Sequence, residues 1–329
     1  MQNPLVSILM PTYKPDARFL REAVESVLAQ TYPHWTLLVN DEPTDVDTKS
    51  IIQPYLGDPR IRYGRNAARL GIGGNWNACL ATAQGEIIQY LFQDDVWDPH
   101  YLAEGVGVLT RESETGMVAM AHIYRSDDSP EAERFLREAG FEGIREARVQ
   151  HLPDGTEEGK SFLRRWLKLG LRPNLVGEPS FVMLHRTVTD RLGKFREDLP
   201  QGLDLEYWVR ALLVTNLHAV AQSAGFFRVH PQAASMSNDA AGAGLFDRLH
   251  CFETLLRLSP ADLKEDVRAA LVEQLSLMGG KYRSRVRGGR KTGGSAILRL
   301  LPFVLRHPWL FLRAMARMLR KGAAETLPA

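Results

Sequence analysis

The sequence contains only two cysteines among its 329 residues, Cys79 and Cys251. A single pair so far apart excludes a disulfide framework and a cysteine-based zinc site. No window holds about 18 uncharged apolar residues in a row, the minimum for a membrane-spanning helix. The opening residues also lack the basic and apolar regions of a signal peptide. These absences predict a protein of a reducing, cytoplasmic compartment.

Glycine motifs that bind phosphate are absent as well. Gly71, Gly73 and Gly74 lie in the run RLGIGGNWN, which has neither the Lys-Ser/Thr of a P-loop nor the spacing of a dinucleotide-binding fingerprint. ATP-hydrolysing and NAD-dependent enzymes are therefore weak candidates. A nucleotide diphosphate bound without a glycine cradle would need a metal ion to neutralise its charge.

Acidic residues are missing from one long segment. Residues 281–321 contain twelve Lys and Arg residues and no Asp or Glu, although the whole chain has a net charge of +2. The rest of the chain has 29 basic and 39 acidic residues. The sequence therefore predicts an acidic body with a basic C-terminal tail.

Short apolar runs alternate with amphipathic helical stripes over the first part of the chain, which is 44% hydrophobic overall. This order predicts an α/β fold, in which a parallel sheet is covered by helices on both faces. Residues 125–160 interrupt the alternation and predict an inserted, partly helical excursion over the surface. The expected strands are residues 5–10, 35–39, 61–63, 87–92, 117–123, 180–184, 218–221 and 225–229.

The expected helices follow from the spacing of apolar residues and from capping signals. One begins at Asp98-Pro99, which has the pattern of an N-cap followed by a first-turn proline. Another begins at Asp16. The remaining expected helices cover about residues 51–56, 76–83, 162–169, 204–213, 245–258 and 261–278.

Carboxylates follow two of the expected strands. Asp41 comes after strand 35–39, and the pair Asp94-Asp95 comes after strand 87–92. Parallel strands end at the same edge of a sheet, where ligands bind, so these groups are expected to converge. Convergent carboxylates suit Mg2+ or Mn2+ with a nucleotide diphosphate. The alternative is that the acids form turns or helix caps, although two adjacent carboxylates repel each other without a cation.

Four segments, in order, resemble family 2 inverting glycosyltransferases of the GT-A fold. The similarity covers roughly residues 4–235 and is carried by VSILMPTY, SVLAQTYPHWTLLVNDEPTD, LGIGGNWNACLATAQGEIIQYLFQDD and LDLEYWVRAL. It implies a nucleotide-diphospho-sugar transferase fold with a mainly parallel sheet flanked by helices. It also implies a nucleotide-diphosphate sugar donor, Mn2+ or Mg2+ as cofactor, and inversion at the anomeric carbon.

The resemblance also implies roles for individual residues. Asp95 is the expected direct metal ligand and Asp94 the expected partner of the ribose or of a metal-bound water, while His230 is either a metal contact or a turn residue. Phe92 replaces an Asp that many members carry, which leaves one direct carboxylate ligand. The expected donor-binding residues are Pro11, Thr12, Tyr13, Asp41, Asn77 and Asp94.

Inverting transfer needs a carboxylate base near the acceptor hydroxyl. The resemblance implies Asp204 for this role, with a simple helix N-cap as its alternative. Leu203 replaces the usual preceding Glu, so Glu206 is a second candidate for the base. Glu178 and Trp97 are expected acceptor contacts, although a Trp at a strand end is more often part of the core.

The basic tail carries arginines at a seven-residue spacing with large apolar residues between them. Pro302 and Pro308 should divide it into two or three short helices. Such helices suit an anionic membrane surface, with Trp309 at the interface. Nucleic acid is not expected as a partner, because binding it would not need so many large apolar residues. The alternative is a helix packed on the body. The arginines are Arg299, Arg306, Arg313 and Arg320.

Together these features predict three regions and one function. Residues 1–235 form the glycosyltransferase domain, 236–280 a helical extension and 281–329 the basic tail. The expected enzyme moves a sugar to a hydroxyl of a glycan, polysaccharide or lipid-linked acceptor at the inner face of the cell membrane. The alternatives are a sugar nucleotidyltransferase, disfavoured because no glycine-rich basic loop follows the first strand, and a membrane-recruited binding protein without turnover.

Overall fold

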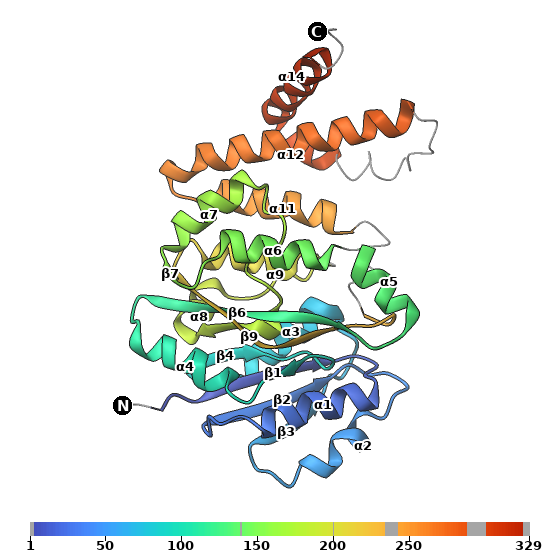
Figure 1. Ribbon diagram of the computed structural model, residues 1–329, viewed down its shortest axis with the longest axis vertical. Coiled ribbons are helices and arrows are strands. Elements are labelled where there is room, and N and C mark those ends of the chain that lie inside the picture. Colours follow the sequence, from blue (N-terminus) through green and yellow to red (C-terminus); the bar gives the residue numbers. More distant parts are fainter. Residues whose placement is uncertain (1–2, 139, 200, 234–242, 288–300, 325–329) are drawn as a thin grey trace.

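A computed structural model describes residues 3–138, 140–199, 201–233, 243–287 and 301–324. Nine strands of these residues form one sheet in the order β3-β2-β1-β4-β8-β6-β9-β5, with β7 paired to β9 (Figure 1). The strands are β1 Val6–Thr12, β2 Trp35–Asp41, β3 Ile61–Arg65, β4 Ile87–Tyr90, β5 Val96–Trp97, β6 Thr115–Ser126, β7 Gly155–Glu157, β8 Val182–His185 and β9 Asn216–Val229.

Half of this sheet has the parallel arrangement predicted from the apolar runs. Strand β1 is parallel to β2 and β4, and β2 is parallel to β3. All seven residues of β1 are buried, as expected of a strand covered on both faces. The carboxyl ends of β1 to β4 therefore lie at one edge, which brings the segments after Thr12, Asp41 and Tyr90 together.

The other half departs from the parallel prediction. Strand β8 runs antiparallel to both β4 and β6, while β6 and β9 are parallel. A short apolar run has the same composition in either direction, so its sequence does not reveal its orientation. The two strands expected at 218–221 and 225–229 are one strand, β9, whose register against β6 shifts between Val220 and Phe226.

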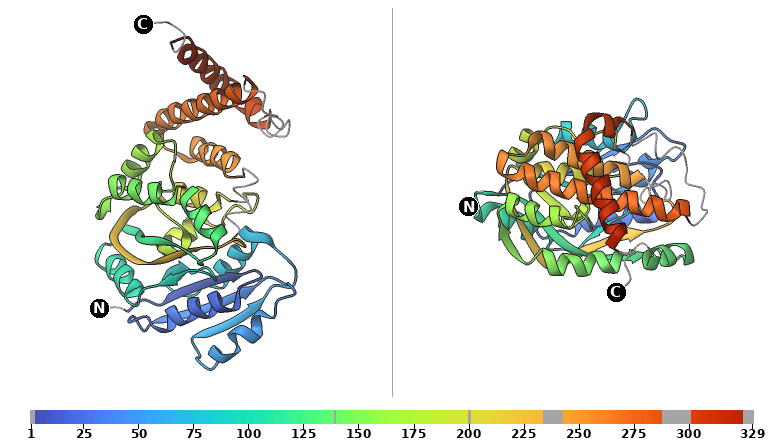
Figure 2. Two further views of the ribbon diagram at one scale, coloured as in Figure 1. Left: turned by 45° about the vertical axis from the view of Figure 1, so that its right-hand side comes forward. Right: turned by 90° about the horizontal axis from the view of Figure 1, so that it is seen from above.

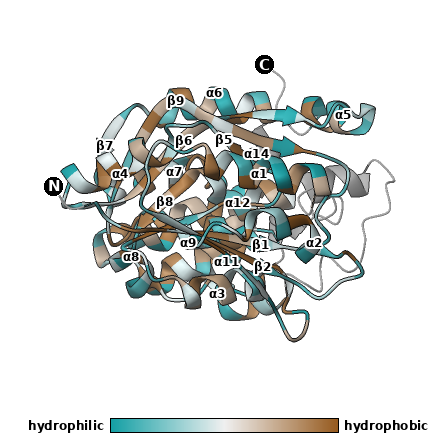
Figure 3. Ribbon diagram, turned by 90° about the horizontal axis from the view of Figure 1, so that it is seen from below, coloured by the Kyte–Doolittle hydropathy of each residue, from teal (hydrophilic) through white to brown (hydrophobic). Residues whose placement is uncertain are grey.

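Helices cover both faces of the sheet and enclose two apolar cores. Helices α1, α2 and α4 pack on one face, and α3, α7, α9, α11 and α12 enclose the core on the other. Figure 3 shows hydrophobic residues on the central strands β1, β2 and β8. The bounds are α1 Ala17–Leu28, α2 Thr48–Ile52, α3 Gly71–Thr82, α4 Tyr101–Arg111, α5 Pro130–Glu138, α6 Phe141–His151, α7 Gly159–Lys168, α8 Arg186–Leu192, α9 Leu203–Ala211, α11 Ala243–Leu258, α12 Ala261–Arg287 and α14 Pro308–Ala324.

One local prediction is wrong, and a second is only partly right. Helix α4 begins at Tyr101 with His100 as its N-cap, because the backbone of Asp98 is instead bonded to Ala224 and Gln30. The excursion over 125–160 is not confined to the surface. It forms α5, α6 and β7, and the Arg148 side chain of α6 is buried, with an exposed fraction of 8%.

The C-terminal helices stack away from the sheet, as Figure 2 shows. Helix α11 packs against α9, α12 packs against α11 and α7, and α14 packs against α12. Their buried apolar residues, among them Phe252 and Leu263, belong to the same core as Trp208 of α9. Among the described residues, no helix is long and apolar enough to cross a bilayer.

The predicted division of the chain into three regions can be compared with the structure at only some positions. The boundary at 235 and 236 lies outside the described residues, as do residues 288–300 and 325–329 of the tail, including Arg299. Within the described part of the tail, residues 301–306 are helical and α14 begins at Pro308, so Pro308 does start a new helix. The three regions stay a prediction, although residues of all three belong to one core.

Candidate active site

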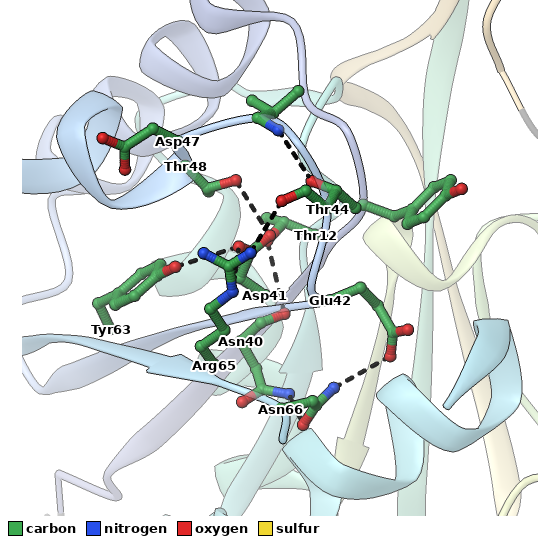
Figure 4. A network of polar contacts seen from close by, with 12 residues as sticks. Thr12, Asn40, Asp41, Glu42, Thr44, Asp47, Thr48, Tyr63, Arg65 and Asn66 are labelled. Atoms are coloured by element: carbon green, nitrogen blue, oxygen red, sulfur yellow. Dashed lines mark hydrogen bonds and ion pairs between the residues drawn. The ribbon is translucent and has the colours of Figure 1, made fainter. Parts of the chain in front are cut away.

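Asp41, at the end of β2, is the centre of a buried polar network (Figure 4). Its carboxylate is fully buried and accepts hydrogen bonds from Thr12 Oγ1 at 2.9 Å, Thr48 Oγ1 at 3.0 Å and the Tyr63 hydroxyl at 3.1 Å. The Arg65 guanidinium lies 3.9 Å away. The strand ends thus hold Asp41 rigidly at the edge where a ligand is expected.

A second set of amides lies beside Asp41. Asn75 of α3 accepts a hydrogen bond from Asn40 Nδ2 at 2.8 Å and donates to the Thr12 carbonyl at 3.2 Å. Asn66 donates to the same Asn75 oxygen and to Glu42. Asn75 therefore fixes α3 against the ends of β1 and β2, a role that was not predicted for it.

Asn77, which was expected to bind the donor, lies elsewhere. Its amide donates to the Phe195 carbonyl at 3.0 Å and to Glu197 at 2.9 Å, and its oxygen accepts from the Phe195 N–H at 2.8 Å. Successive residues of an α-helix are rotated by about 100° around its axis. Asn75 and Asn77, two positions apart, therefore point to different sides of α3. Asn75 therefore lies beside the ends of β1 and β2, whereas the donor-binding role expected of Asn77 stays a prediction.

The segments after β1 and β4 are tied together at this edge. Gln93 accepts from the Tyr13 N–H at 2.8 Å and donates to the Tyr13 carbonyl at 3.1 Å. Pro11 and Thr12 are buried, while Tyr13 is 39% exposed and the Arg69 guanidinium lies 4.5 Å from its ring centroid. Tyr13 therefore offers an open aromatic face beside the Asp41 network.

Asp94 and His230 meet at the same edge from opposite halves of the sheet. The His230 Nε2 and the Asp94 Oδ2 are 2.8 Å apart. Burial lowers the pKa of His230, but its hydrogen bond and charge interaction with Asp94 outweigh that effect and raise the pKa. His230 thus comes together with the acidic pair, as one of its two expected readings requires.

Asp95 is more enclosed than a direct metal ligand was expected to be. It is fully buried, accepts from Ser180 Oγ at 2.5 Å on one oxygen and accepts from the Arg228 N–H at 3.0 Å on the other. Burial, together with the nearby Asp94 charge, raises the pKa of Asp95 well above its ordinary range. The geometry favours Asp94, not Asp95, as the carboxylate that is open to a ligand.

Arg228 and Phe92 complete the surroundings of the acidic pair. Arg228 is 4% exposed, donates to the Asp94 carbonyl and pairs with Glu22, so it is a buried residue whose charge is paired. The Phe92 ring packs on Trp76 with centroids 4.8 Å apart. Phe92 therefore fills space in the core and adds no ligand to the site.

The side chains at this edge fit a divalent cation in part. An open carboxylate on Asp94 and an imidazole on His230 are donors that Mn2+ accepts. No group of three or more acidic, His or Cys side chains within the described ranges forms a complete cation cage. A cation bound here would take its remaining ligands from diphosphate oxygens and water, as such ions commonly do.

Asp204 lies in the first turn of α9, after the N-cap residue Gly202. It is therefore not the N-cap itself. Its partly buried carboxylate accepts a hydrogen bond from Asn174 Nδ2 at 3.2 Å. Burial is the main cause that raises the pKa of Asp204 to about 7. A carboxylate with such a pKa is suited to take a proton near neutral pH.

Glu206, the second candidate for the base, is occupied in the core. It is 1% exposed, pairs with Arg210 at 2.9 Å and accepts from Thr254 Oγ1 at 2.9 Å. Leu203 is buried as well. Of the two acids, Asp204 is the one with access to a ligand, although its catalytic role stays a prediction.

One short segment, residues 174–180, connects the two acidic centres. At its start Asn174 bonds to Asp204 and to both backbone groups of Gly177. At its end Ser180 donates to Asp95 and accepts from the Phe92 N–H. A single stretch of seven residues therefore contacts Asp204 at one end and Asp95 at the other.

The two expected acceptor contacts differ in their surroundings. Trp97 is 3% exposed, stacks on Tyr101 at 4.4 Å and donates to the Ser180 carbonyl, so it is a core residue and has no surface for an acceptor. Glu178 lies in the connecting segment, and its side chain is 20% exposed. Asn174 and Ser180 were not predicted, because single Asn and Ser residues in a loop carry no distinctive spacing.

Comparison with known proteins gives a consistent result. Residues 7–170 match the family described as Glycosyl transferase family 2. An uncharacterized protein of Mycobacterium tuberculosis is 32% identical over 214 residues, which is 64% of this chain and 63% of that protein. WfgD of Escherichia coli, named UDP-Glc:alpha-D-GlcNAc-diphosphoundecaprenol beta-1,3-glucosyltransferase, is 32% identical over 34% of this chain and 44% of its own length. The chain thus spans less than two thirds of these relatives.

Solved structures share the fold. The first 349 residues of Staphylococcus aureus TarS, in complex with UDP-GlcNAc, match 97% of this chain and 92% of theirs with a TM-score of 0.58 and 13% identity. The mannosyltransferase PcManGT from Pyrobaculum calidifontis, in complex with GDP-Man and Mn2+, covers 96% and 87% with a TM-score of 0.53 and 17% identity. The predicted GT-A fold with a helical C-terminal region is confirmed.

Proposed function

This chain belongs to glycosyl transferase family 2, and from that premise we propose that it is a metal-dependent inverting glycosyltransferase. The donor is a nucleotide-diphosphate sugar, and the acceptor is a hydroxyl of a glycan, polysaccharide or lipid-linked glycan. The observation that supports the proposal is the segment 174–180, which bonds to Asp204 at one end and to Asp95 at the other. A sugar transferred between a diphosphate and a base requires that juxtaposition.

In the proposed reaction, the acceptor oxygen attacks the anomeric carbon and Asp204 takes the hydroxyl proton. The bond from the anomeric carbon to the diphosphate oxygen breaks, and its electron pair leaves with the nucleoside diphosphate. Asn174 holds the Asp204 carboxylate in place without adding charge. Attack opposite the leaving group inverts the anomeric configuration, and no covalent enzyme intermediate is needed.

Donor binding is proposed to use the edge formed by β1 to β4. The open ring of Tyr13 would stack against the base, and the Asp41 and Asn75 network would hold the strand ends in position. Asp94 and His230 would hold Mn2+ or Mg2+, which when bound offsets negative charge on the diphosphate. PcManGT, whose structure contains Mn2+ with its donor, is consistent with this assignment.

The tail is proposed to bring the enzyme to an anionic membrane surface. The helix over residues 301–306 packs on the body through Phe303, and α14 does so through Ala314; these residues are 4% and 3% exposed. The opposite sides of these two helices expose large apolar side chains, including Leu305 at 72% and Trp309 at 77%. The remaining members of this exposed apolar face are Leu301, Leu312, Met315 and Leu319.

Ion pairs attach these two helices to the body. Three arginines next to the exposed apolar face pair with acids of the body: Arg306 with Glu253, Arg313 with Glu265 and Arg317 with Glu273. Packing on the body therefore does not exclude membrane contact, because the two use opposite faces of the helix. An apolar face with Trp and an excess of basic residues is typical of interfacial helices. A lipid-linked acceptor, as named for WfgD, would lie at such a surface.

The function is tested by nucleoside diphosphate release from UDP-glucose, UDP-N-acetylglucosamine and GDP-mannose, with and without Mn2+ and with lipid-linked glycan acceptors. We expect release that depends on both metal and acceptor. Formation of a sugar-nucleotide diphosphate bond would instead support a nucleotidyltransferase. Donor binding without turnover under every condition would support a binding protein and overturn the proposal.

A further inference from the structure

The buried groups around Glu178 are not used by the proposed reaction. The His122 Nε2 lies 2.7 Å from Glu178 Oε2, and the Tyr124 hydroxyl donates to Oε1 at 3.0 Å. Both come from β6, and Phe181 stacks on the His122 ring at 4.1 Å. Glu178 is therefore held on one side by the sheet, while its side chain keeps an exposed fraction of 20%.

A buried arginine supports this cluster from the inserted excursion. Arg148 of α6 donates to the Met120 carbonyl at 3.0 Å, and its Nη1 has no hydrogen-bond partner among the described residues. Gly177 makes room for it, because a Cβ there would lie 2.3 Å from Nη1, and its φ of +110° also favours glycine. Burial alone would raise the pKa of Glu178, but the charges of His122 and Arg148 hold it below its ordinary value. Glu178 is thus kept ionised.

The position of Glu178 between the two acidic centres indicates what it contacts. It lies in the middle of the segment that bonds to Asp204 at one end and to Asp95 at the other. If the proposed function is correct, the diphosphate lies at Asp94 and the acceptor hydroxyl at Asp204. The transferred sugar must then occupy the space between them, next to Glu178.

We infer that Glu178 binds hydroxyls of the transferred sugar and that Arg148, with His122, positions it for this contact. This inference rests on the proposed function and names the residue that selects the donor sugar. A carboxylate has about four acceptor sites, and the Tyr124 hydroxyl occupies one of them. His122 pairs with the enclosed Oε2 by charge and donates no hydrogen bond to it. A sugar hydroxyl donating to an ionised carboxylate forms one of the stronger hydrogen bonds in proteins.

The test compares binding of a nucleotide sugar with binding of its nucleoside diphosphate, by calorimetry on the full chain with Mn2+ and no acceptor. E178Q should lower the affinity for the nucleotide sugar about tenfold or more and change the affinity for the nucleoside diphosphate by no more than about twofold. E131Q, at an exposed position at the start of α5, serves as the matched control and should change neither value. Unchanged nucleotide-sugar binding by E178Q would overturn the inference, and a raised KM for the acceptor in that case would place Glu178 on the acceptor.

Arg148 is tested in the same assay. R148M should lose the preference for the nucleotide sugar, and R148K, which keeps the charge, should restore most of it. R145M changes an exposed arginine of the same helix and should have no effect. If R148M does not fold, H122Q takes its place, because it removes the other positive group beside Glu178. Loss of the preference in H122Q supports the inference, whereas a lower melting temperature with an unchanged preference would contradict it. A parent protein that binds none of the nucleotide sugars would refute the proposed function itself.

Discussion

The Asn174 side-chain N–H donates to the Asp204 carboxylate across 3.2 Å, and the same Asn174 bonds to both backbone groups of Gly177. One neutral amide therefore fixes the position of Asp204, the proposed base, relative to the segment that leads to Ser180 and Asp95. Because an amide adds no charge, it orients Asp204 without stabilising its ionised form as an arginine would. Asp204 keeps the raised pKa that burial gives it.

D204N should abolish sugar transfer and leave donor binding unchanged. Loss of a general base commonly lowers the rate about 10²- to 10⁴-fold. Asn has the same shape and can keep the contact with Asn174, so nucleotide-sugar affinity should stay within about twofold. Steady-state kinetics and calorimetry measure the two effects, and near-parental turnover would refute the assigned base.

Transfer should depend on pH through Asp204. The base must be ionised to act, and its pKa is raised to about 7, so kcat/KM should rise about tenfold per pH unit below 7 and level off above it. A profile of kcat/KM between pH 5 and 9 checks this. A plateau that extends down to pH 5 would contradict it.

The same shift has a consequence for stability. Because the folded-state pKa lies above that of the unfolded chain, the folded protein binds more protons between about pH 4 and 7, and its free energy of unfolding falls as pH rises through that range. D204N removes the ionisable group. Its melting temperature should exceed that of the parent at pH 8, with a smaller difference at pH 4. This measurement also verifies that D204N is folded.

Asn75 and Asn77 offer a matched pair on one helix. N75A breaks the bonds to Asn40, Asn66 and the Thr12 carbonyl, and we expect nucleoside diphosphate affinity to fall about tenfold. N77A removes only the ties to Phe195 and Glu197, so it should lower stability by about 1–3 kcal/mol and leave that affinity unchanged. Calorimetry and denaturant unfolding separate the two. The reverse pattern would restore Asn77 to the nucleotide site.

Membrane recruitment should depend on the exposed apolar face of residues 301–319. W309E with L305E introduces charge at side chains that contact nothing in the core, so binding to phosphatidylserine vesicles should fall about tenfold or more with the melting temperature unchanged. Sedimentation with anionic and neutral vesicles measures this. Equal binding of parent and variant would refute the membrane assignment, and so would a parent that does not bind anionic vesicles.

The sequence was a good guide to the parallel half of the fold and to the acids at strand ends. Buried Val- and Ile-rich runs such as β1 have a clear pattern, and carboxylates directly after them are conspicuous. The sequence was a poor guide to the direction of a short strand and to the face of a helix on which a given side chain lies. The orientation of β8 leaves no mark on a four-residue apolar run, and the exchange of Asn75 for Asn77 reflects a rotation along α3 that two neighbouring amides do not reveal.

Predictions also failed where a contact comes from a distant part of the chain. Arg148 lies in a charged excursion that has the composition of a surface, yet its side chain is buried beside Gly177. Trp97 follows the acidic pair closely in sequence, yet it stacks inward on Tyr101. Both outcomes are set by packing between elements far apart in the chain.

Contacts between α9 and α11 limit how far the chain can be truncated from its C-terminal side. Asp247 of α11 accepts the backbone N–H groups of Gln201 and Gly202, directly before Asp204, and Thr254 of α11 donates to Glu206. Removal of everything after β9 would strip these supports and leave the apolar side of α9 in water. A fragment ending near residue 235 should therefore aggregate or misplace its base, and α11 has to be kept in any minimal active enzyme.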